Sequence, residues 1–192
     1  MPDSRQLVFR PLNEDNWKDF EQLFGDRGAA GGCWCMLWRK KPGEFKEHKG
    51  NGNRKSMHHL ARSGRAPGIL AYEGDTPVGW CAIAPREEYP ALSRSRVLKP
   101  IDDQPVWSVS CFFIDKSHRK MGLSAKLLEA AVDYAKARGA KIIEGYPIEP
   151  DNNNYPAVYA WVGLAKTFRK AKFKECIRRS PTRPIMRREI KS

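Results

Sequence analysis

The segment at 115–128, DKSHRKMGLSAKLL, combines basic side chains, a glycine and the start of a periodic apolar run. Gly122 stands just before a predicted helix, whose first turn presents main-chain N–H groups that have no partner inside the helix. These groups and the positive end of the helix dipole bind phosphate. Arg119, Lys120 and Lys126 add positive charge. The segment therefore predicts either a phosphate-binding loop or an ordinary turn between a strand and a helix.

The elements on either side of this loop predict two parallel strands joined by a helix. VWSVSCFFID, at 106–115, is apolar enough for a buried strand. Apolar residues recur at helical spacing over 124–138, and Gly139 is a typical residue to end that helix. AKIIEGYP, at 140–147, predicts the second buried strand. A strand, a helix and a strand in about forty residues are typical of a right-handed βαβ unit.

Alternation along the first of these strands predicts which side chains share a face. One face would carry Trp107, Val109, Cys111 and Phe113. The opposite face would carry Ser108, Ser110, Phe112 and Ile114.

The remainder of the chain predicts short elements separated by turns. We expect a strand at 6–11, a helix at 14–24 after an Asn13 cap, partial helix at 42–67, a hairpin of strands at 69–72 and 78–84, long loops at 85–105 and 147–156, a helix at 158–173 and one or two terminal strands. We find no internal repeat. The expectation is one domain over 1–192, of the α/β class with a mixed sheet.

The segment FFIDKSHRKMGLSAKLL resembles motif A of the GNAT superfamily of acyl-CoA-dependent acyltransferases, whose pattern is R/Q-x-x-G-x-G/A after a strand. Ser124 stands at the last small position of that pattern. The resemblance is detailed over 106–145 and extends to the order of elements elsewhere. GCWCMLWR and RRSPTRPIMR are similar to segments of one subgroup, to which no substrate can be attached. The resemblance implies the GNAT acyl-CoA acyltransferase fold.

The same resemblance implies acetyl-CoA as co-substrate and a primary amine, on a small molecule or a peptide, as acceptor. The acetyl group would pass directly to the amine in a ternary complex. The pyrophosphate would be held by the backbone of Arg119, Lys120, Met121, Gly122, Leu123 and Ser124. The pantetheine would run beside the backbone of Phe112, Phe113 and Ile114, whose N–H groups would help to orient the thioester.

Glu144 is the candidate general base, because it lies within a strand predicted to be buried. Desolvation there would raise the pKa of the carboxyl group toward the range useful for a base. The alternative is a carboxylate paired with a nearby lysine or arginine. Many relatives carry a tyrosine acid in a pattern Y-x-x-x-G-F, which here has Phe168 and Lys172 at the tyrosine and glycine positions. Water, Tyr155 or Tyr159 would then supply the proton. The departure also permits an acyl-CoA-binding module without catalysis.

Residues 31–38, GGCWCMLW, predict either an acceptor-pocket wall or plain core packing. Cys33, Trp34 and Trp38 are the candidate substrate-binding residues. The C-x-C spacing is tighter than structural zinc sites favour, so no metal is expected. Cys111 lies on the strand beside the expected thioester, where a small apolar filler is favoured over a covalent nucleophile.

The net charge of +13 suits a polyanionic ligand, and CoA is one. The basic clusters, at 39–41, 48–65 and 169–188, accompany no recognisable nucleic-acid-binding motif, so a basic nucleic-acid-associated protein is the less favoured alternative. Five scattered cysteines without a C-x-x-C suit reduced thiols in the cytoplasm. No apolar run is long enough for a membrane span, and the N-terminus lacks a signal-peptide pattern. The oligomeric state is open, a homodimer included.

Overall fold

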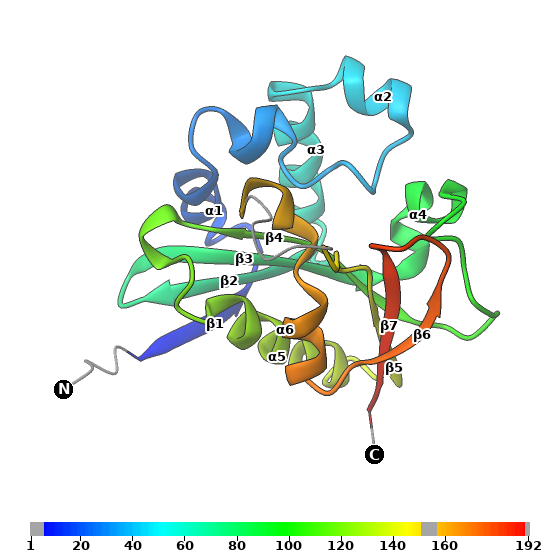
Figure 1. The fold of residues 1–192 in the computed structure, drawn as a ribbon. Helices are drawn as coiled ribbons and strands as arrows, with labels where there is room; N and C mark the ends of the chain where they lie inside the picture. Colours follow the sequence, from blue (N-terminus) through cyan, green and yellow to red (C-terminus); the bar gives the residue numbers. More distant parts are fainter. Residues whose placement is uncertain (1–5, 151–156, 191–192) are drawn as a thin grey trace.

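One mixed sheet forms the centre of the protein in a computed structural model that describes residues 6–150 and 157–190 (Figure 1). Its seven strands follow the order β1-β2-β3-β4-β5-β7-β6. Their bounds are Leu7–Pro11, Gly68–Glu73, Thr76–Pro85, Trp107–Ile114, Ile142–Gly145, Lys174–Arg178 and Pro184–Glu189 for β1 to β7. β4 and β5 pair in parallel, and the other neighbours pair antiparallel. The predicted α/β class and the βαβ unit are confirmed.

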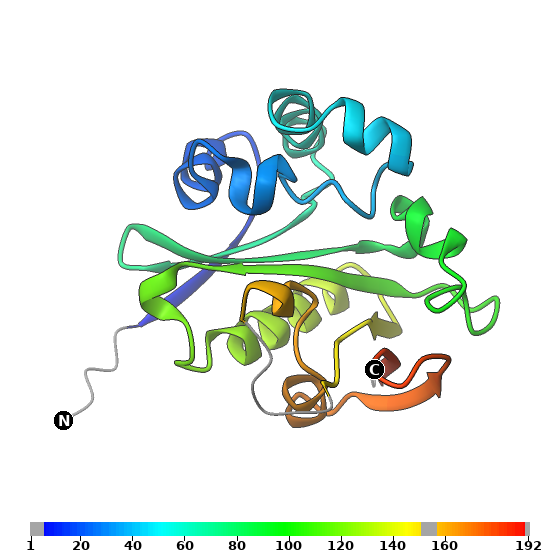
Figure 2. The same cartoon turned by 45° about the horizontal axis from the view of Figure 1, so that its top comes forward.

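Helices cover both faces of the sheet, as Figure 2 shows. One face carries α1 (Trp17–Phe24), α2 (Pro42–Glu47) and α3 (Asn51–Arg62), and the other carries α5 (Leu123–Lys136) and α6 (Ala165–Lys170). The shorter elements are η1 (Gly28–Gly32), η2 (Arg86–Glu88), α4 (Pro90–Arg94), η3 (Lys116–His118) and η4 (Ala157–Val162). None of the helices in the described ranges combines the length and the apolar character that a membrane crossing requires.

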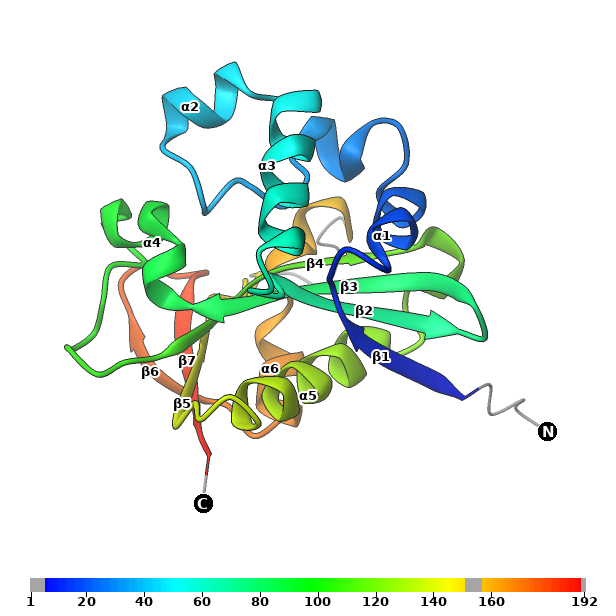
Figure 3. The same ribbon diagram turned by 180° about the vertical axis from the view of Figure 1, so that it is seen from behind.

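Two hydrophobic cores follow from these layers. Leu127 and Leu128 on α5 are fully buried against β3, β4 and β5, in a core that also includes Phe168 of α6. On the opposite face, Phe20 of α1 and Met57 of α3 are fully buried against β2 and β3. Figure 3 shows α1 and α3 on one side of β1, β2 and β3, with α5 on the other. The strands between these cores are apolar on both faces for this reason.

Several predicted elements differ from the structure at their ends. The hairpin and the partial helix at 42–67 are confirmed. The first helix begins at Trp17 rather than residue 14, because the side chains of Asn13 and Asn16 each accept the other's main-chain N–H, at 3.2 and 2.8 Å. The predicted loop at 85–105 contains η2 and α4. Of the loop predicted at 147–156, residues 151–156 lie outside the described part.

The single helix predicted at 158–173 is wrong. η4 ends at Val162, Gly163 adopts a φ of +83°, and α6 begins at Ala165. A side chain at position 163 would meet Phe168 at 2.7 Å from its Cβ. The helix is interrupted there, and Leu164 forms a parallel β-bridge with Ile148 beside β5.

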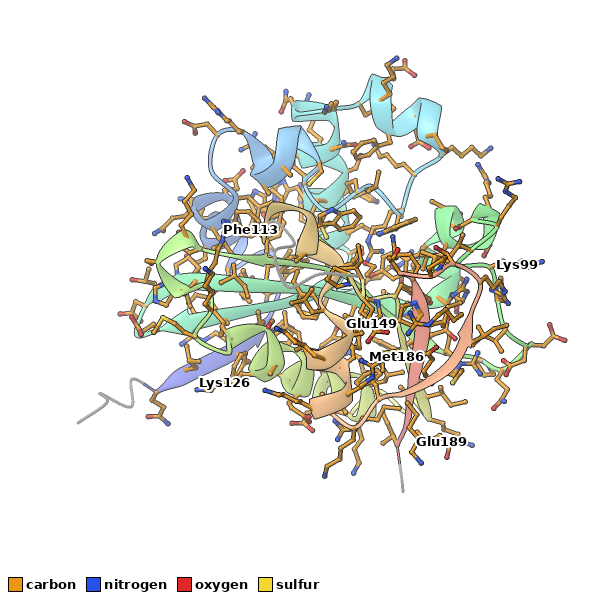
Figure 4. All side chains as sticks on the ribbon, in the orientation of Figure 1. Lys99, Phe113, Lys126, Glu149, Met186 and Glu189 are labelled. Atoms are coloured by element: carbon orange, nitrogen blue, oxygen red, sulfur yellow. The ribbon has the colours of Figure 1, made fainter. Side chains whose placement is uncertain are left out.

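The prediction that side chains alternate strictly between the two faces of β4 is also wrong. Ala82 pairs with Cys111 and Ile83 pairs with Val109, so Ser110 is an extra residue that forms a bulge. The bulge moves Phe112 onto the α5 face together with Val109. Cys111 and Phe113 lie instead on the face of α1 and α3, and Figure 4 shows Phe113 beside α1. The rings of Phe113 and Phe24 have centroids 5.1 Å apart.

Candidate active site

The two parallel strands separate at the middle of the sheet. β5 pairs with β4 only as far as Val109 and Gly145. The N–H of Asp115, just after β4, donates to the carbonyl of Val78 in β3 at 3.0 Å. Because successive N–H groups of a strand point to alternate sides, those of Phe112 and Ile114 point to the edge that β5 has left. β4 therefore presents main-chain donors along this gap, against which η4 packs.

The loop between β4 and α5 forms a concave set of donors. Lys120 and Gly122 have φ angles of +64° and +80°, and such left-handed residues turn successive N–H groups toward one point. Within the described residues, the N–H groups of 120–124 donate to no protein acceptor. The N–H of Arg119 bonds to the carbonyl of Lys116 at 3.5 Å, so it is used within η3.

Basic side chains surround this loop. The Arg119 Nε donates to the carbonyl of Ile114 at 3.0 Å, which fixes the guanidinium beside the end of β4. Lys120 is exposed, and Lys126 projects from the first turns of α5 (Figure 4). Five free N–H groups, a helix N-terminus and these charges can together hold a diphosphate.

Glu144 lies on β5 next to the point of separation and is fully buried. Its Oε1 accepts from Arg86 at 2.6 Å and from the Tyr146 hydroxyl at 2.7 Å, and its Oε2 accepts from Arg187 Nε at 2.7 Å. This arrangement matches the alternative in which the carboxylate is ion-paired. Burial raises the pKa of Tyr146 well above its usual value, so that hydroxyl stays a donor. Ser108 bonds to the same hydroxyl at 2.7 Å.

Arg187 extends this network to the surface. Its two terminal nitrogens bond to Asp102 at 2.7 and 3.0 Å, and this pairing lowers the pKa of Asp102 to about 2. Arg179 donates to the carbonyls of Val97, Lys99 and Pro100 and so holds the same loop. Arg187 of β7 and Arg179, just after β6, thus hold the chain at 97–102 beside the sheet.

We expect the free energy of unfolding to decrease as pH falls from about 4 to 2, in part through Asp102. Its folded pKa lies below the unfolded value, so its contribution is complete above the unfolded pKa and is lost as pH falls through the folded one. Asp102→Asn should flatten this part of a stability–pH curve measured by urea unfolding. Asp103→Asn, at an exposed neighbour, is the matched control; equal curves for both variants would contradict the assignment.

Phe168, at the position of the usual tyrosine acid, is fully buried. A Cβ on Gly145 would lie 2.1 Å from its ring, so the ring fills the space beside the end of β5. Lys172 adopts a φ of +64°, the left-handed conformation that glycine has at low cost in the family pattern. Tyr155 and the side chain of Tyr159 lie outside the described part of the structure.

The segment at 31–38 divides between core and surface. Trp34 is buried, and its ring stacks on Phe24 at 5.8 Å, as expected for core packing. The thiol of Cys33 contacts the carbonyl of Gly28 at 3.7 Å. Trp38 is partly exposed, and its ring centroid lies 6.0 Å from that of Trp161 in η4. The structure therefore brings Trp38, rather than Trp34, toward the gap that η4 borders.

The thiols of Cys35 and Cys111 are in contact under the same segment. A hydrogen bond from Cys111, helped by the Trp80 N–H at 3.2 Å, lowers the pKa of Cys35 although burial opposes the change. The same contact raises the pKa of Cys111 well above its usual value. Cys111 is thus kept as a neutral thiol, which disfavours a role as nucleophile. In the described part of the chain, no three metal-ligating side chains come together.

A basic cavity near this segment was missed by sequence reasoning. Its lining comes from three elements and the chain between them: Met36, Arg39, Lys40, Glu44, Lys55, Ser56, His59, Leu60, Arg65 and Glu88. The signal in the sequence was the basic character of 39–41 and 48–65. Only folding shows that these two stretches face each other across a hollow.

A strand that ends in a loop of free N–H groups, next to a parallel strand that diverges from it, forms a site that can hold a phosphate-bearing molecule. The chain belongs to the acetyltransferase (GNAT) family, which it matches over residues 13–163. No curated protein sequence matches this chain.

Solved structures share the fold at low identity. An N-acetyltransferase from Staphylococcus aureus Mu50 has a TM-score of 0.55 and 14% identity, covering 97% of this chain and 99% of that one. A GNAT-family acetyltransferase from Listeria monocytogenes 4b F2365 has a TM-score of 0.60 and 10% identity, over 96% and 95%. PaiA N-acetyltransferase from Thermoplasma acidophilum, in complex with coenzyme A, has a TM-score of 0.55 and 10% identity, over 96% and 99%.

Proposed function

We propose that this protein is an N-acetyltransferase that moves an acetyl group from acetyl-CoA to a primary amine. The observation that carries the proposal is the set of free N–H groups at 120–124, directly after β4 and at the N-terminus of α5. Family membership supports acetyl transfer in general. A cytoplasmic location and one domain spanning 1–192 stay predictions.

Each part of the site has a task in this proposal. The N–H groups of Lys120, Met121, Gly122, Leu123 and Ser124 bind the diphosphate, with Arg119 beside them. The free edge of β4, at 112–114, aligns the pantetheine and directs N–H groups at the thioester carbonyl. Such donors stabilise the charge that develops on that oxygen. Holding both reactants in one complex supplies much of the remaining rate.

The transfer forms a bond between the amine nitrogen and the acetyl carbon, and breaks the bond from that carbon to sulfur. The nitrogen loses a proton, and the thiolate that leaves takes one up. Glu144 stays the proposed base, although its two arginine partners favour a role in holding β5. Water is the proposed proton source for sulfur, because Phe168 carries no proton to give.

A second candidate is an acyl-CoA-binding module without turnover. The observation that favours it is Phe168, buried where relatives have an acid. A low pKa makes a thiolate a tolerable leaving group, so the first proposal does not require that acid.

The experiment that tests the proposed function measures two quantities on the purified protein. Calorimetry measures CoA affinity, and a thiol reagent measures CoA release from acetyl-CoA with a panel of amines. We expect micromolar affinity and amine-dependent release, with the acetylated product seen by mass spectrometry. Affinity without release for every amine would support the binding module, and absence of affinity would contradict both candidates.

A further inference from the structure

We propose that the basic cavity bounded by α2, α3 and η2 binds an anionic group of the acceptor, so that the acceptor is an amine that also carries a carboxylate or a phosphate. The inference rests on the proposed function, because only a transferase has an acceptor. The cavity itself is a feature of the fold, and its charge can be tested without turnover.

The cavity has the size of a small-molecule site. Its volume is about 510 Å³, within the range of roughly 300–1,000 Å³ typical of ligand pockets. Met36 and Lys40 are buried residues of its wall. Lys55, His59 and Arg65 are exposed at its rim. The cavity is open to solvent, so a ligand bound there would contact a partly apolar, strongly basic surface and stay partly hydrated.

Arg39, like Lys40, is a buried charge in the wall of this cavity. Its side chain is 3% exposed, and it bonds to Glu88 at 2.6 Å and to the Tyr89 hydroxyl at 3.1 Å. Its Nε is buried and, within the described residues, has no acceptor. Because this atom has almost no accessible surface, an anion in the cavity would feel the Arg39 charge at longer range than a hydrogen bond.

The remaining charges leave the cavity positive. The Lys40 Nζ lies 3.8 Å from a carboxylate oxygen of Glu44, and Glu88 pairs with Arg39. Each acidic residue of the wall is therefore paired with one basic residue. Within the described part of the chain, Lys55 and Arg65 have no carboxylate within 4.0 Å. The wall thus holds four basic and two acidic side chains, an excess of two positive charges. Such a site attracts anions and repels polyamines.

Two side chains, Tyr89 and Cys35, connect the cavity wall to β4. Tyr89 contacts both Arg39 and Ser110, the bulge residue of β4. Cys35, beside Met36, contacts Cys111 on the same strand. Ser110 and Cys111 begin the stretch of β4 that β5 has left. The cavity wall is therefore joined, through one further side chain in each case, to the two residues that directly precede 112–114 of β4.

Matched amines test the inference. Aminoalkyl carboxylates and aminoalkyl phosphates would be compared with the amides and alcohols of the same chain length. We expect the KM of the anionic amines to be at least roughly tenfold lower, as one added ion pair in a partly buried site implies. Equal KM values across each pair, or preference for polyamines, would overturn the inference.

Variants of the rim locate the effect. Lys55→Gln with Arg65→Gln should raise the KM of anionic amines roughly tenfold or more, with the KM of neutral amines and CoA affinity unchanged. Lys46→Gln, an exposed lysine on α2 outside the cavity, is the matched control. Lys55→Arg should restore much of the affinity if charge is the cause. An equal effect in the control would overturn the assignment.

Glutarate, an anion without an amine, separates this inference from the proposed function. If calorimetry shows that it binds the wild type and not the double variant, the anion site stands even if no amine is acetylated. If amines are acetylated but glutarate does not bind and charge does not affect KM, the anion site is wrong and the transferase stands.

Discussion

Gly122→Asp is expected to lower the affinity for CoA roughly a hundredfold while the protein stays folded. The new carboxylate would stand at the N-terminus of α5, among the N–H groups that are proposed to hold the diphosphate. Repulsion between charges a few ångströms apart at a protein surface amounts to about 3 kcal/mol, which corresponds to that factor. Calorimetric titration with CoA measures it.

Strain alone does not produce this effect. Gly122 has a φ of +80°, so any side chain there costs about 1–2 kcal/mol of stability. A Cβ at this position would meet no atom within 4 Å, so the fold tolerates it.

Gly139→Asp is the matched control for Gly122→Asp. Gly139 follows the same helix at its other end, with a φ of +82° and open space around its Cβ. It should lose similar stability and keep its CoA affinity. Equal loss of affinity in both variants, or none in either, would contradict the diphosphate cradle.

Glu144→Ala is expected to lower the free energy of unfolding by about 3–5 kcal/mol. The carboxylate is fully buried between Arg86 and Arg187, whose side chains are each 11% exposed. Removing one partner of a buried ion pair leaves uncompensated charge. Here Arg86 loses the carboxylate with which it pairs, and Arg187 is left with Asp102. Denaturant unfolding monitored by circular dichroism measures the change.

Glu129→Ala is the matched control for this loss. Glu129 also pairs with an arginine, Arg188, at 2.8 Å, but its side chain is 47% exposed. Surface pairs contribute about 0–1 kcal/mol, so the control should stay close to the wild type. A loss of less than about 1 kcal/mol in Glu144→Ala would contradict the structural role.

Glu144→Gln separates the structural role from the proposed base. It should be assayed at a temperature at which it is fully folded. If Glu144 is the base, kcat should fall in this variant and the acidic limb of the pH profile should disappear. If Glu144 only holds β5 in place, the acidic limb should be unchanged. Unchanged turnover would remove Glu144 from the mechanism.

The agreement between sequence and structure is best where the pattern is local. The βαβ unit rests on neighbouring residues: the apolar run of β4, the periodic stripe of α5 and Gly139 after its end. The loop before α5 was predicted for the same reason, since Gly122 and the first turn of the helix are consecutive. Hydrophobic periodicity and helix ends are encoded within a few residues of each other.

Other features depend on residues far apart in the chain. The bulge at Ser110 exists only in the pairing of β4 with β3, so alternation alone put Cys111 on the wrong face. The helix at 158–173 breaks because Gly163 and Phe168 pack beside β5, which no periodicity reports.

The amino-acid sequence by itself determined the class of fold and the position of the loop before α5 that is proposed to bind phosphate, because both arise from short stretches whose patterns are self-contained. Only the tertiary structure decided that Glu144 lies between Arg86 and Arg187, which are 58 and 43 residues away. It also decided that residues from the basic stretches 39–41 and 48–65 line one open cavity. Burial and pairing of charge are set by which segments pack together, and residue types do not specify that.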